Sequence, residues 1–212
     1  MSFLDQLKSK KKSLERVETK LTTESGLVYK EIKSVDGFIK QSLLTEQTFG
    51  FVVDIKPDLH VGKVFEFLYF GSQDSACDIN ILSSLQITDI LSVGVAVPTN
   101  SNLMYTFIEA YDLPTFKMTN IFDDCFIYIE NIRLRNRRVY IHCNAGVSRS
   151  PTIVIAYVMK YLKLDFKSAY QFVKNTRLTI KPNAGFISQL IDYENKLKEF
   201  QSILFGFMVI KG

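Results

Sequence analysis

The stretch that decides the fold reads VYIHCNAGVSRSP and spans residues 139–151. It opens with three β-branched or aromatic residues, which are typical of a short buried strand. It closes on Pro151, and proline is favoured near the start of a helix because its missing N–H has no intrahelical partner there. The stretch therefore predicts a strand, then a tight loop over 142–149, then a helix over about 150–162.

A loop in this position is suited to hold an anion. Successive backbone N–H groups can point inward as a nest, and the following helix adds the positive end of its dipole. The planar guanidinium of Arg149 can donate hydrogen bonds to two oxygens of a phosphate at once, which the ammonium of lysine cannot do in the same geometry. The same field favours the thiolate of Cys143, which is the reactive form. We expect Arg149 and five backbone segments to bind the phosphate: Asn144, Ala145, Gly146, Val147 and Ser148.

A plainer interpretation makes Cys143 one more buried cysteine and Gly146 an ordinary turn residue. Each of these residues taken alone would favour that interpretation. Cysteine and arginine stand six positions apart, however, between a strand and a helix that starts with proline. The combination favours a nucleophile in a phosphate-binding loop.

The composition of the chain limits the classes of fold, partner and cofactor that we expect. The chain has 212 residues, 47% hydrophobic and 23% charged, which suits one sizeable α/β or α+β domain with tails. A net charge of +4 is too small to require nucleic acid or a membrane as partner. Three cysteines do not make a disulfide framework, so we expect a cytoplasmic location, with the nucleus as a second one. No Cys/His spacing resembles a zinc site, so we expect neither a metal nor a cofactor.

The chain is expected to divide into three parts. Residues 1–57 are interpreted as an N-terminal extension, partly flexible or helical, because apolar residues from Phe3 to Leu21 recur at roughly helical spacing. Residues 58–202 form the compact domain, and residues 203–212 an apolar C-terminal tail. A docking strand, a loosely held end and a splice-dependent end all remain open for that tail.

Strands alternate with amphipathic helices along the compact domain. This alternation predicts an α/β domain with a largely parallel central sheet flanked by helices. The expected strands cover 65–70, 87–93, 107–112 and 139–141, and the expected helices cover 72–85, 121–132, 150–162, 166–175 and 184–200.

The stretch His142-Cys143, five residues, Arg149-Ser150 resembles the signature of the protein tyrosine phosphatase superfamily. The longer stretch 142–157 resembles its dual-specificity branch, and the chain is similar to an atypical member of that branch over about 59–200. The resemblance implies the fold of that superfamily, with a mixed sheet of about five strands. It also implies hydrolysis of phosphotyrosine and of phosphoserine or phosphothreonine in proteins, through a phosphocysteine intermediate.

The resemblance also implies roles outside the loop. Asp112, followed by Leu-Pro, matches the general acid that protonates the leaving oxygen. Asp123 and Asp124 are rivals, although the helical pattern places them at a helix start, where carboxylates interact with the dipole. Ser150 would donate a hydrogen bond to the cysteine sulfur, and the alternative is a helix-capping serine.

Two more residues are expected to support the loop. His142 is interpreted as a structural support for the nucleophile. Asn183 resembles a family residue that braces the loop, with a turn asparagine as the equal alternative. Cys77 and Cys125 are expected to be core residues.

The interior of the loop discriminates between substrates. It contains no lysine, unlike the loops of phosphoinositide phosphatases, and it lacks the inner histidine of relatives that act on RNA ends. Phosphorylated proteins are therefore the expected partners, with MAP kinases or their upstream kinases implied by the resemblance. Lys10-Lys11-Lys12 loosely resembles a kinase docking motif, although a solvated surface is the ordinary interpretation. A non-catalytic phosphoprotein-binding or scaffold module of the same fold is the alternative function.

Overall fold

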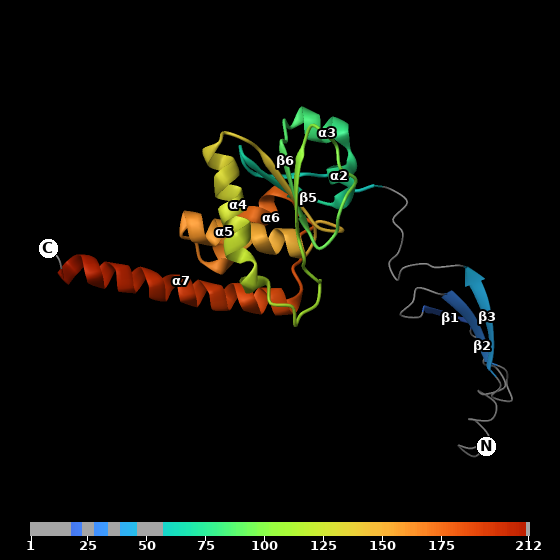
Figure 1. Cartoon of the computed structure of the whole chain (residues 1–212). Helices are drawn as coiled ribbons and strands as arrows, with labels where there is room; N and C mark the ends of the chain where they lie inside the picture. Colours follow the sequence, from blue (N-terminus) through green and yellow to red (C-terminus); the bar gives the residue numbers. More distant parts are fainter. Residues whose placement is uncertain (1–17, 23–27, 34–38, 46–56, 211–212) are drawn as a thin grey trace, which may run out of the picture. The chain divides into compact units, whose positions relative to one another are not determined.

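The computed structural model describes residues 18–22, 28–33, 39–45 and 57–210 (Figure 1). The chain divides into two units, Met1–Ile55 and Lys56–Gly212, which we describe separately.

The described strands of the first unit form a small antiparallel sheet. They are β1 (Glu18–Thr22), β2 (Val28–Lys33) and β3 (Ile39–Thr45), in that order. The helix expected over residues 3–21 is therefore wrong for residues 18–21, while residues 1–17 lie outside the described residues. The register aligns Leu21, Tyr29 and Leu43 across the three strands. A short helix without a docking partner is only marginally stable.

The second unit is built on a five-stranded mixed sheet. Its order is β4-β5-β8-β6-β7, and every neighbouring pair is parallel except β4 with β5. The expected α/β class with a largely parallel sheet is confirmed. The strands are β4 (Gly62–Phe65), β5 (Leu68–Gly71), β6 (Asp89–Val93), β7 (Met104–Ile108) and β8 (Val139–His142).

Helices cover both faces of this sheet (Figure 1). The alternation of side chains along a strand sends Phe70, Leu91 and Ile141 into one core and Tyr69 and Tyr140 into another. The first core is closed by α4 (Phe122–Leu134), α5 (Arg149–Leu162), α6 (Phe166–Thr176) and α7 (Ala184–Ile210). The second is closed by α2 (Gln73–Cys77) and α3 (Ile79–Ser84), and the short 3-10 helix η1 (Met118–Asn120) precedes α4.

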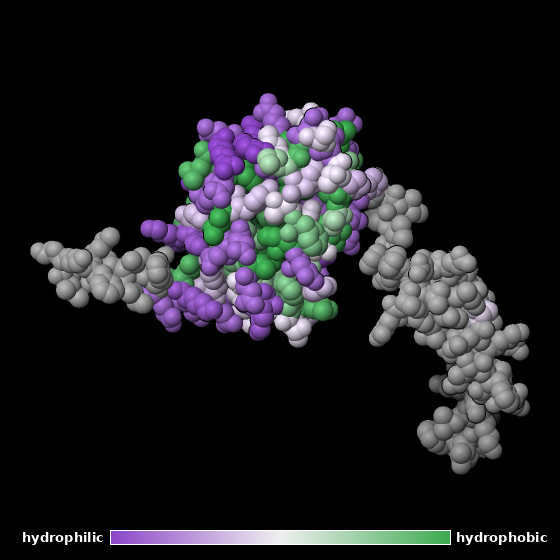
Figure 2. All heavy atoms as spheres, in the orientation of Figure 1, coloured by the Kyte–Doolittle hydropathy of each residue, from purple (hydrophilic) through white to green (hydrophobic). Residues whose placement is uncertain are grey.

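The helix α5 forms the centre of the larger layer. Its residues from Arg149 to Met159 are all buried, so it is covered on every side. By contrast, Figure 2 shows hydrophilic side chains along the described part of α7, on the surface of the unit. A fully buried helix is rigid support for whatever its first turn holds.

Several expected boundaries are corrected. The strand expected over 65–70 is a hairpin, because the chain turns at Glu66 and Phe67 between β4 and β5. The helix expected over 72–85 breaks at Asp78, whose carboxylate caps α3 by accepting from the N–H groups of Asn80 and Ile81.

The segment expected to be a separate C-terminal tail continues α7 as far as Ile210. No proline interrupts residues 184–210, so the backbone hydrogen bonding of the helix can continue. Residues 211–212 lie outside the described residues.

Candidate active site

The loop expected over 142–149 lies between the end of β8 and the start of α5, as predicted. Four successive carbonyl groups of this loop are turned outward. Asn144 O accepts from Gln73 N at 2.9 Å, and Val147 O accepts from Lys181 N at 2.8 Å. Ala145 O and Gly146 O accept from Arg177 at 3.0 and 3.2 Å.

The N–H groups of the same peptides can bind an anion. Because these four carbonyl groups are held outward, the N–H groups of the same peptides, those of residues 145–148, are available on the inside of the loop. Within the described residues, none of these N–H groups donates to a protein acceptor. The loop therefore has the form of an anion-binding nest above the N-terminus of α5.

Gly146 is required for this conformation. Its φ is +66°, in the left-handed region that favours glycine. A Cβ added there would lie 2.3 Å from the backbone carbon of Gly71. The loop therefore packs directly against the end of β5.

Arg149 is the first residue of α5 and is 8% exposed. Its Nη1 donates to Val93 O and Ala110 O at 3.4 and 3.3 Å, which fixes the plane of the guanidinium. Its Nε is buried and has no hydrogen-bond partner within the described residues. Buried donors are normally paired, so this N–H indicates a place for an acceptor atom of a ligand.

Cys143 is buried at the bottom of the loop, 2% exposed. Ser150 Oγ lies 3.3 Å from the Cys143 sulfur and can donate a hydrogen bond to it. The same hydroxyl lies 3.4 Å from Gly71 O, so it has two acceptors within reach. The structure thus brings Ser150 to the sulfur, as the family resemblance implied. Ser148, not Ser150, occupies the N-cap of α5.

His142 directly precedes Cys143 and is fully buried. Its Nε2 lies 2.8 Å from Ser92 Oγ, and its Nδ1 lies 3.3 Å from Cys143 O. Burial, with a smaller effect of the nearby Arg149 charge, lowers the pKa of His142 to about 4. A neutral imidazole held on both sides fits the supporting position predicted for this residue.

Asp112 reaches the loop from the segment that follows β7. Its Oδ1 accepts from Ser148 Oγ at 2.7 Å and from Asn183 Nδ2 at 2.8 Å. Its Oδ2 lies 3.9 Å from Arg149 Nε. β7 ends at Ile108, so Asp112 is in a loop and not in the strand expected over 107–112.

The rival carboxylates lie in the first turn of α4. Asp123 is 81% exposed on its side chain and pairs with Lys160 at 3.1 Å. Neither Asp123 nor Asp124 forms a hydrogen bond or ion pair with the loop among the described residues. Of the candidate acids, Asp112 is the one joined to the phosphate-binding loop.

Asn183 combines both of the interpretations that the sequence left open. Its Oδ1 accepts from Phe186 N at 3.0 Å, which caps the first turn of α7. Its backbone N donates to Ser148 Oγ at 3.1 Å, and its Nδ2 donates to Asp112. Asn183 is therefore both a helix-start residue and a partner of the loop.

Arg177 is the residue of this site that the sequence did not reveal. Its side chain is fully buried, donates to the loop carbonyls Ala145 O and Gly146 O, and pairs with Asp58. It also donates to His60 O. The available signal was its spacing, because Arg177 comes four residues after Val173 and eight after Ala169, the two buried residues of α6, and directly follows that helix as its C-cap. A charged side chain that is buried beyond the end of a helix needs a partner for its charge.

Removing Asp58, the partner of the buried Arg177 charge, should lower the free energy of unfolding. Burial acts to raise the pKa of Asp58, but hydrogen bonds from Arg177 and His60 N outweigh it and hold that pKa below its usual value. We expect Asp58→Ala to lower the free energy of unfolding by about 3 kcal/mol, because Arg177 keeps its charge in a buried site. Urea unfolding at pH 7 measures this change.

The expected pH dependence has a definite sign. A depressed folded-state pKa adds stability above the unfolded value near 4, and that stability is lost as the pH falls through the folded value. Native protein should therefore lose stability in this acid range, and Asp58→Ala should lose less. The control Asp123→Ala removes an exposed pair and should cost at most about 1 kcal/mol. Equal costs for the two variants would contradict the buried role of Arg177.

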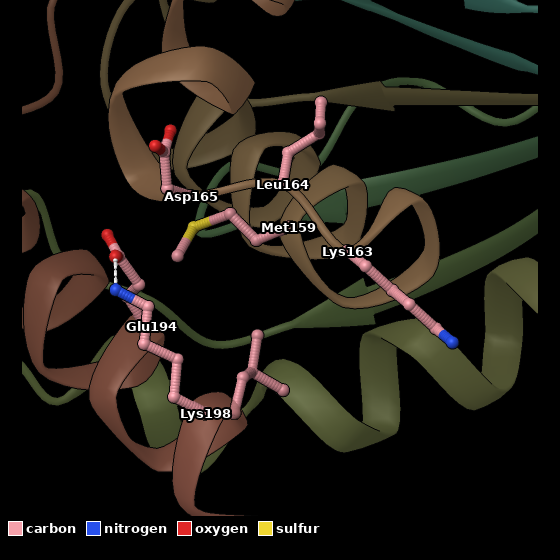
Figure 3. Close-up of a pocket in the computed structure, with 7 residues that line it drawn as sticks. Met159, Lys163, Leu164, Asp165, Glu194 and Lys198 are labelled. Atoms are coloured by element: carbon pink, nitrogen blue, oxygen red, sulfur yellow. Dashed lines mark hydrogen bonds and ion pairs between the residues drawn. The ribbon is translucent and has the colours of Figure 1, made fainter. Parts of the chain in front are cut away.

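Another hollow of the described surface is lined by residues outside this loop. Figure 3 shows one between the end of α5 and α7, where Glu194 and Lys198 pair with each other beside Met159 and Leu164. Within the described residues, no group of three His, Cys, Asp or Glu side chains could hold a metal ion. No described helix is both long and apolar enough to cross a membrane. The basic run Lys10-Lys11-Lys12 lies outside the described residues.

Comparison with known proteins gives consistent matches. A family model described as dual specificity phosphatase, catalytic domain, matches residues 68–196. Dual specificity protein phosphatase 19 of Mus musculus is 39% identical over 147 residues, which cover 68% of this chain and 67% of the mouse protein. A probable dual specificity protein phosphatase of Dictyostelium discoideum is 34% identical over 229 residues, covering 93% of this chain and 99% of that one. The crystal structure of DUSP15 gives a TM-score of 0.60 at 32% identity, over 66% of this chain and 95% of that one.

One further relative is named as a MAP kinase phosphatase. MAP kinase phosphatase with leucine-rich repeats protein 3 of Dictyostelium discoideum is 39% identical over 138 residues. These residues are 64% of this chain but 16% of that protein.

Proposed function

Because this chain belongs to the dual-specificity phosphatase family, a family of cysteine-dependent protein phosphatases, we propose that it hydrolyses phosphotyrosine, phosphoserine and phosphothreonine in proteins. The reaction would run through a phosphocysteine intermediate on Cys143. The alternative is a module of the same fold that binds phosphoproteins without hydrolysing them.

One observation carries the catalytic proposal. The loop that begins at Cys143 leaves the N–H groups of residues 145–148 without a protein acceptor, and it ends at Arg149, whose buried Nε has no hydrogen-bond partner within the described residues. Donors held in place before the substrate arrives stabilise the charge of the transferring phosphoryl group without reorganisation. A phosphate seated there places its phosphorus next to the nucleophile.

The first step forms one bond and breaks one. The thiolate of Cys143 attacks phosphorus, and the bond from phosphorus to the substrate oxygen breaks. Protonated Asp112 gives its proton to the departing oxygen and becomes a carboxylate.

The second step reverses the proton movement. Asp112 takes a proton from water as the water oxygen attacks phosphorus, and the bond from phosphorus to sulfur breaks. Ser150 donates to the sulfur at 3.3 Å and stabilises the thiolate that departs. Inorganic phosphate leaves, and Cys143 and Asp112 return to their starting states.

The substrate and the location are part of the proposal. The absence of lysine from the loop supports phosphoprotein rather than a phosphoinositide, because no extra cation meets a second ring phosphate. The relative named as a MAP kinase phosphatase supports a MAP kinase, or a kinase upstream of it, as substrate. A catalytic thiol and two further free cysteines suit the reducing conditions of the cytoplasm or nucleus.

Phosphate release from peptides tests this proposal. We expect the full chain to dephosphorylate a phosphotyrosine and a phosphothreonine peptide in the presence of EDTA, with much slower release from an inositol phosphate. Binding of the peptides by the native chain without any release of phosphate would support the binding module instead. To test the kinase partner, Lys10, Lys11 and Lys12 would be changed to alanine in the full chain. Unchanged turnover of a phosphorylated MAP kinase would argue against docking through this run.

A further inference from the structure

The two oxygens of the Asp112 carboxyl group have different surroundings. Oδ1 receives hydrogen bonds from both Ser148 Oγ and Asn183 Nδ2. Oδ2 accepts no hydrogen bond from the described residues and lies 3.9 Å from Arg149 Nε, on the side of the phosphate site. A proton placed on Oδ1 would displace one of its two donors, whereas a proton on Oδ2 displaces none. The neutral acid therefore carries its proton on Oδ2.

The direction of the Ser148 hydroxyl is also determined. Its oxygen accepts from the backbone N of Asn183 at 3.1 Å, so its own proton is free to point toward Asp112. Ser148 is 7% exposed and directly precedes Arg149. Asp112 is thus held by Ser148, a residue of the phosphate-binding loop itself, and by Asn183, which directly precedes α7.

We propose that Ser148 and Asn183 are positioning residues for the general acid. They hold Oδ1 of Asp112 and direct the protonated Oδ2 toward the leaving oxygen of the substrate. Ser148 then has a task in addition to the backbone contact expected from the sequence, and Asn183 braces the acid as well as the loop. This inference rests on the proposed function, because it assigns these residues to one proton transfer within that reaction.

Two aryl phosphates separate this role from phosphate binding. Phenyl phosphate has a basic leaving oxygen that needs the proton, whereas 2,4-dinitrophenyl phosphate has a leaving group that departs without it. For Ser148→Ala in the full chain, we expect kcat for phenyl phosphate to fall about 10-fold more than kcat for the dinitrophenyl ester. KM should change little for either ester.

A double-mutant cycle then identifies the partner. In the Asp112→Asn background there is no acid to position, so adding Ser148→Ala should cause no further fall in kcat for phenyl phosphate. A full additional fall would show that Ser148 acts independently of Asp112 and would overturn the inference.

Asn183 needs a variant that keeps its capping role. Asn183→Ser retains an oxygen that can accept from Phe186 N but removes the amide donor to Asp112. We expect the same selective loss on phenyl phosphate as for Ser148→Ala. The control Ser84→Ala removes an exposed serine hydroxyl far from the loop in sequence, and both esters should be hydrolysed as by the native chain.

The possible outcomes distinguish a failure of the positioning role from a failure of the proposed phosphatase reaction. Equal losses on both esters would make Ser148 and Asn183 supports of phosphate binding, and the positioning role would be wrong while the phosphatase reaction stood. Failure of the native chain to hydrolyse either ester would instead reject the phosphatase reaction and the positioning role together.

Discussion

Replacing Cys143 by serine should reduce turnover of a phosphotyrosine peptide by more than about 10⁴-fold. A serine hydroxyl is not ionised at neutral pH, so the loop would hold phosphate above an oxygen that cannot attack it. The nest and Arg149 are unchanged, and the variant should still bind phosphate or a phosphopeptide. Phosphate release measures the first effect, and calorimetry with a phosphopeptide measures the second.

The other cysteines provide the control. Cys77 is exposed at the end of α2, so the core position expected for it is wrong. Because Cys77 forms no hydrogen bond with the loop among the residues that the structure describes, Cys77→Ser should retain native turnover. Burial, together with the charge of Asp124, raises the pKa of Cys125 to about 12, so that thiol stays protonated at pH 7. Loss of activity on treatment with iodoacetate should therefore result from alkylation of Cys143 and not of Cys125. Turnover that survived Cys143→Ser would exclude the phosphocysteine mechanism.

Replacing Arg149 by lysine should lower kcat by about 10²–10³-fold, although the charge is conserved. The guanidinium uses Nη1 to hold itself on Val93 O and Ala110 O while Nε remains for the ligand. The single ammonium group of lysine cannot donate to these two backbone carbonyls and also donate to the phosphate oxygens as a planar guanidinium does. Steady-state kinetics on a phosphotyrosine peptide checks both kcat and KM.

A second arginine serves as the matched control. Arg133 in α4 is exposed and pairs with Glu130 three residues before it, so Arg133→Lys should leave kcat unchanged. If Arg149→Lys retained activity within a few-fold of the native chain, a simple positive charge would suffice. The paired geometry inferred for the guanidinium would then be wrong.

The loop, the strand before it and the helix after it were predictable because each depends on neighbouring residues. The short β-branched strand, Pro151 near the helix start and Arg149 six residues after Cys143 lie within 139–151, and local patterns encode local structure. The positions of Ser150 and His142 beside Cys143 follow from the same continuity. The helical interpretation of residues 18–21 failed because scattered apolar residues fit a helix and a strand almost equally well.

More distant parts of the site required the order of the strands. Asp112 and Ser148 are 36 residues apart, and Asp112 and Asn183 are 71 apart. They meet because β7 and β8 flank β6, which brings the segment after β7 to the same edge of the sheet as the loop. The resemblance to a known family indicated Asp112, but no local pattern showed which groups hold it.

The sequence by itself predicted the chemistry proposed for this protein, since the proposed nucleophile, the phosphate-binding loop and the arginine are contiguous and their conformations follow from glycine, proline and the start of a helix. Only the tertiary structure decided how that chemistry is held. Arg177 fastens two loop carbonyls and pairs with Asp58, 119 residues away, and Ser148 and Asn183 leave one oxygen of Asp112 to carry the proton. Such contacts depend on how distant segments pack and on the need to pair every buried charge, and neither is written in a local pattern.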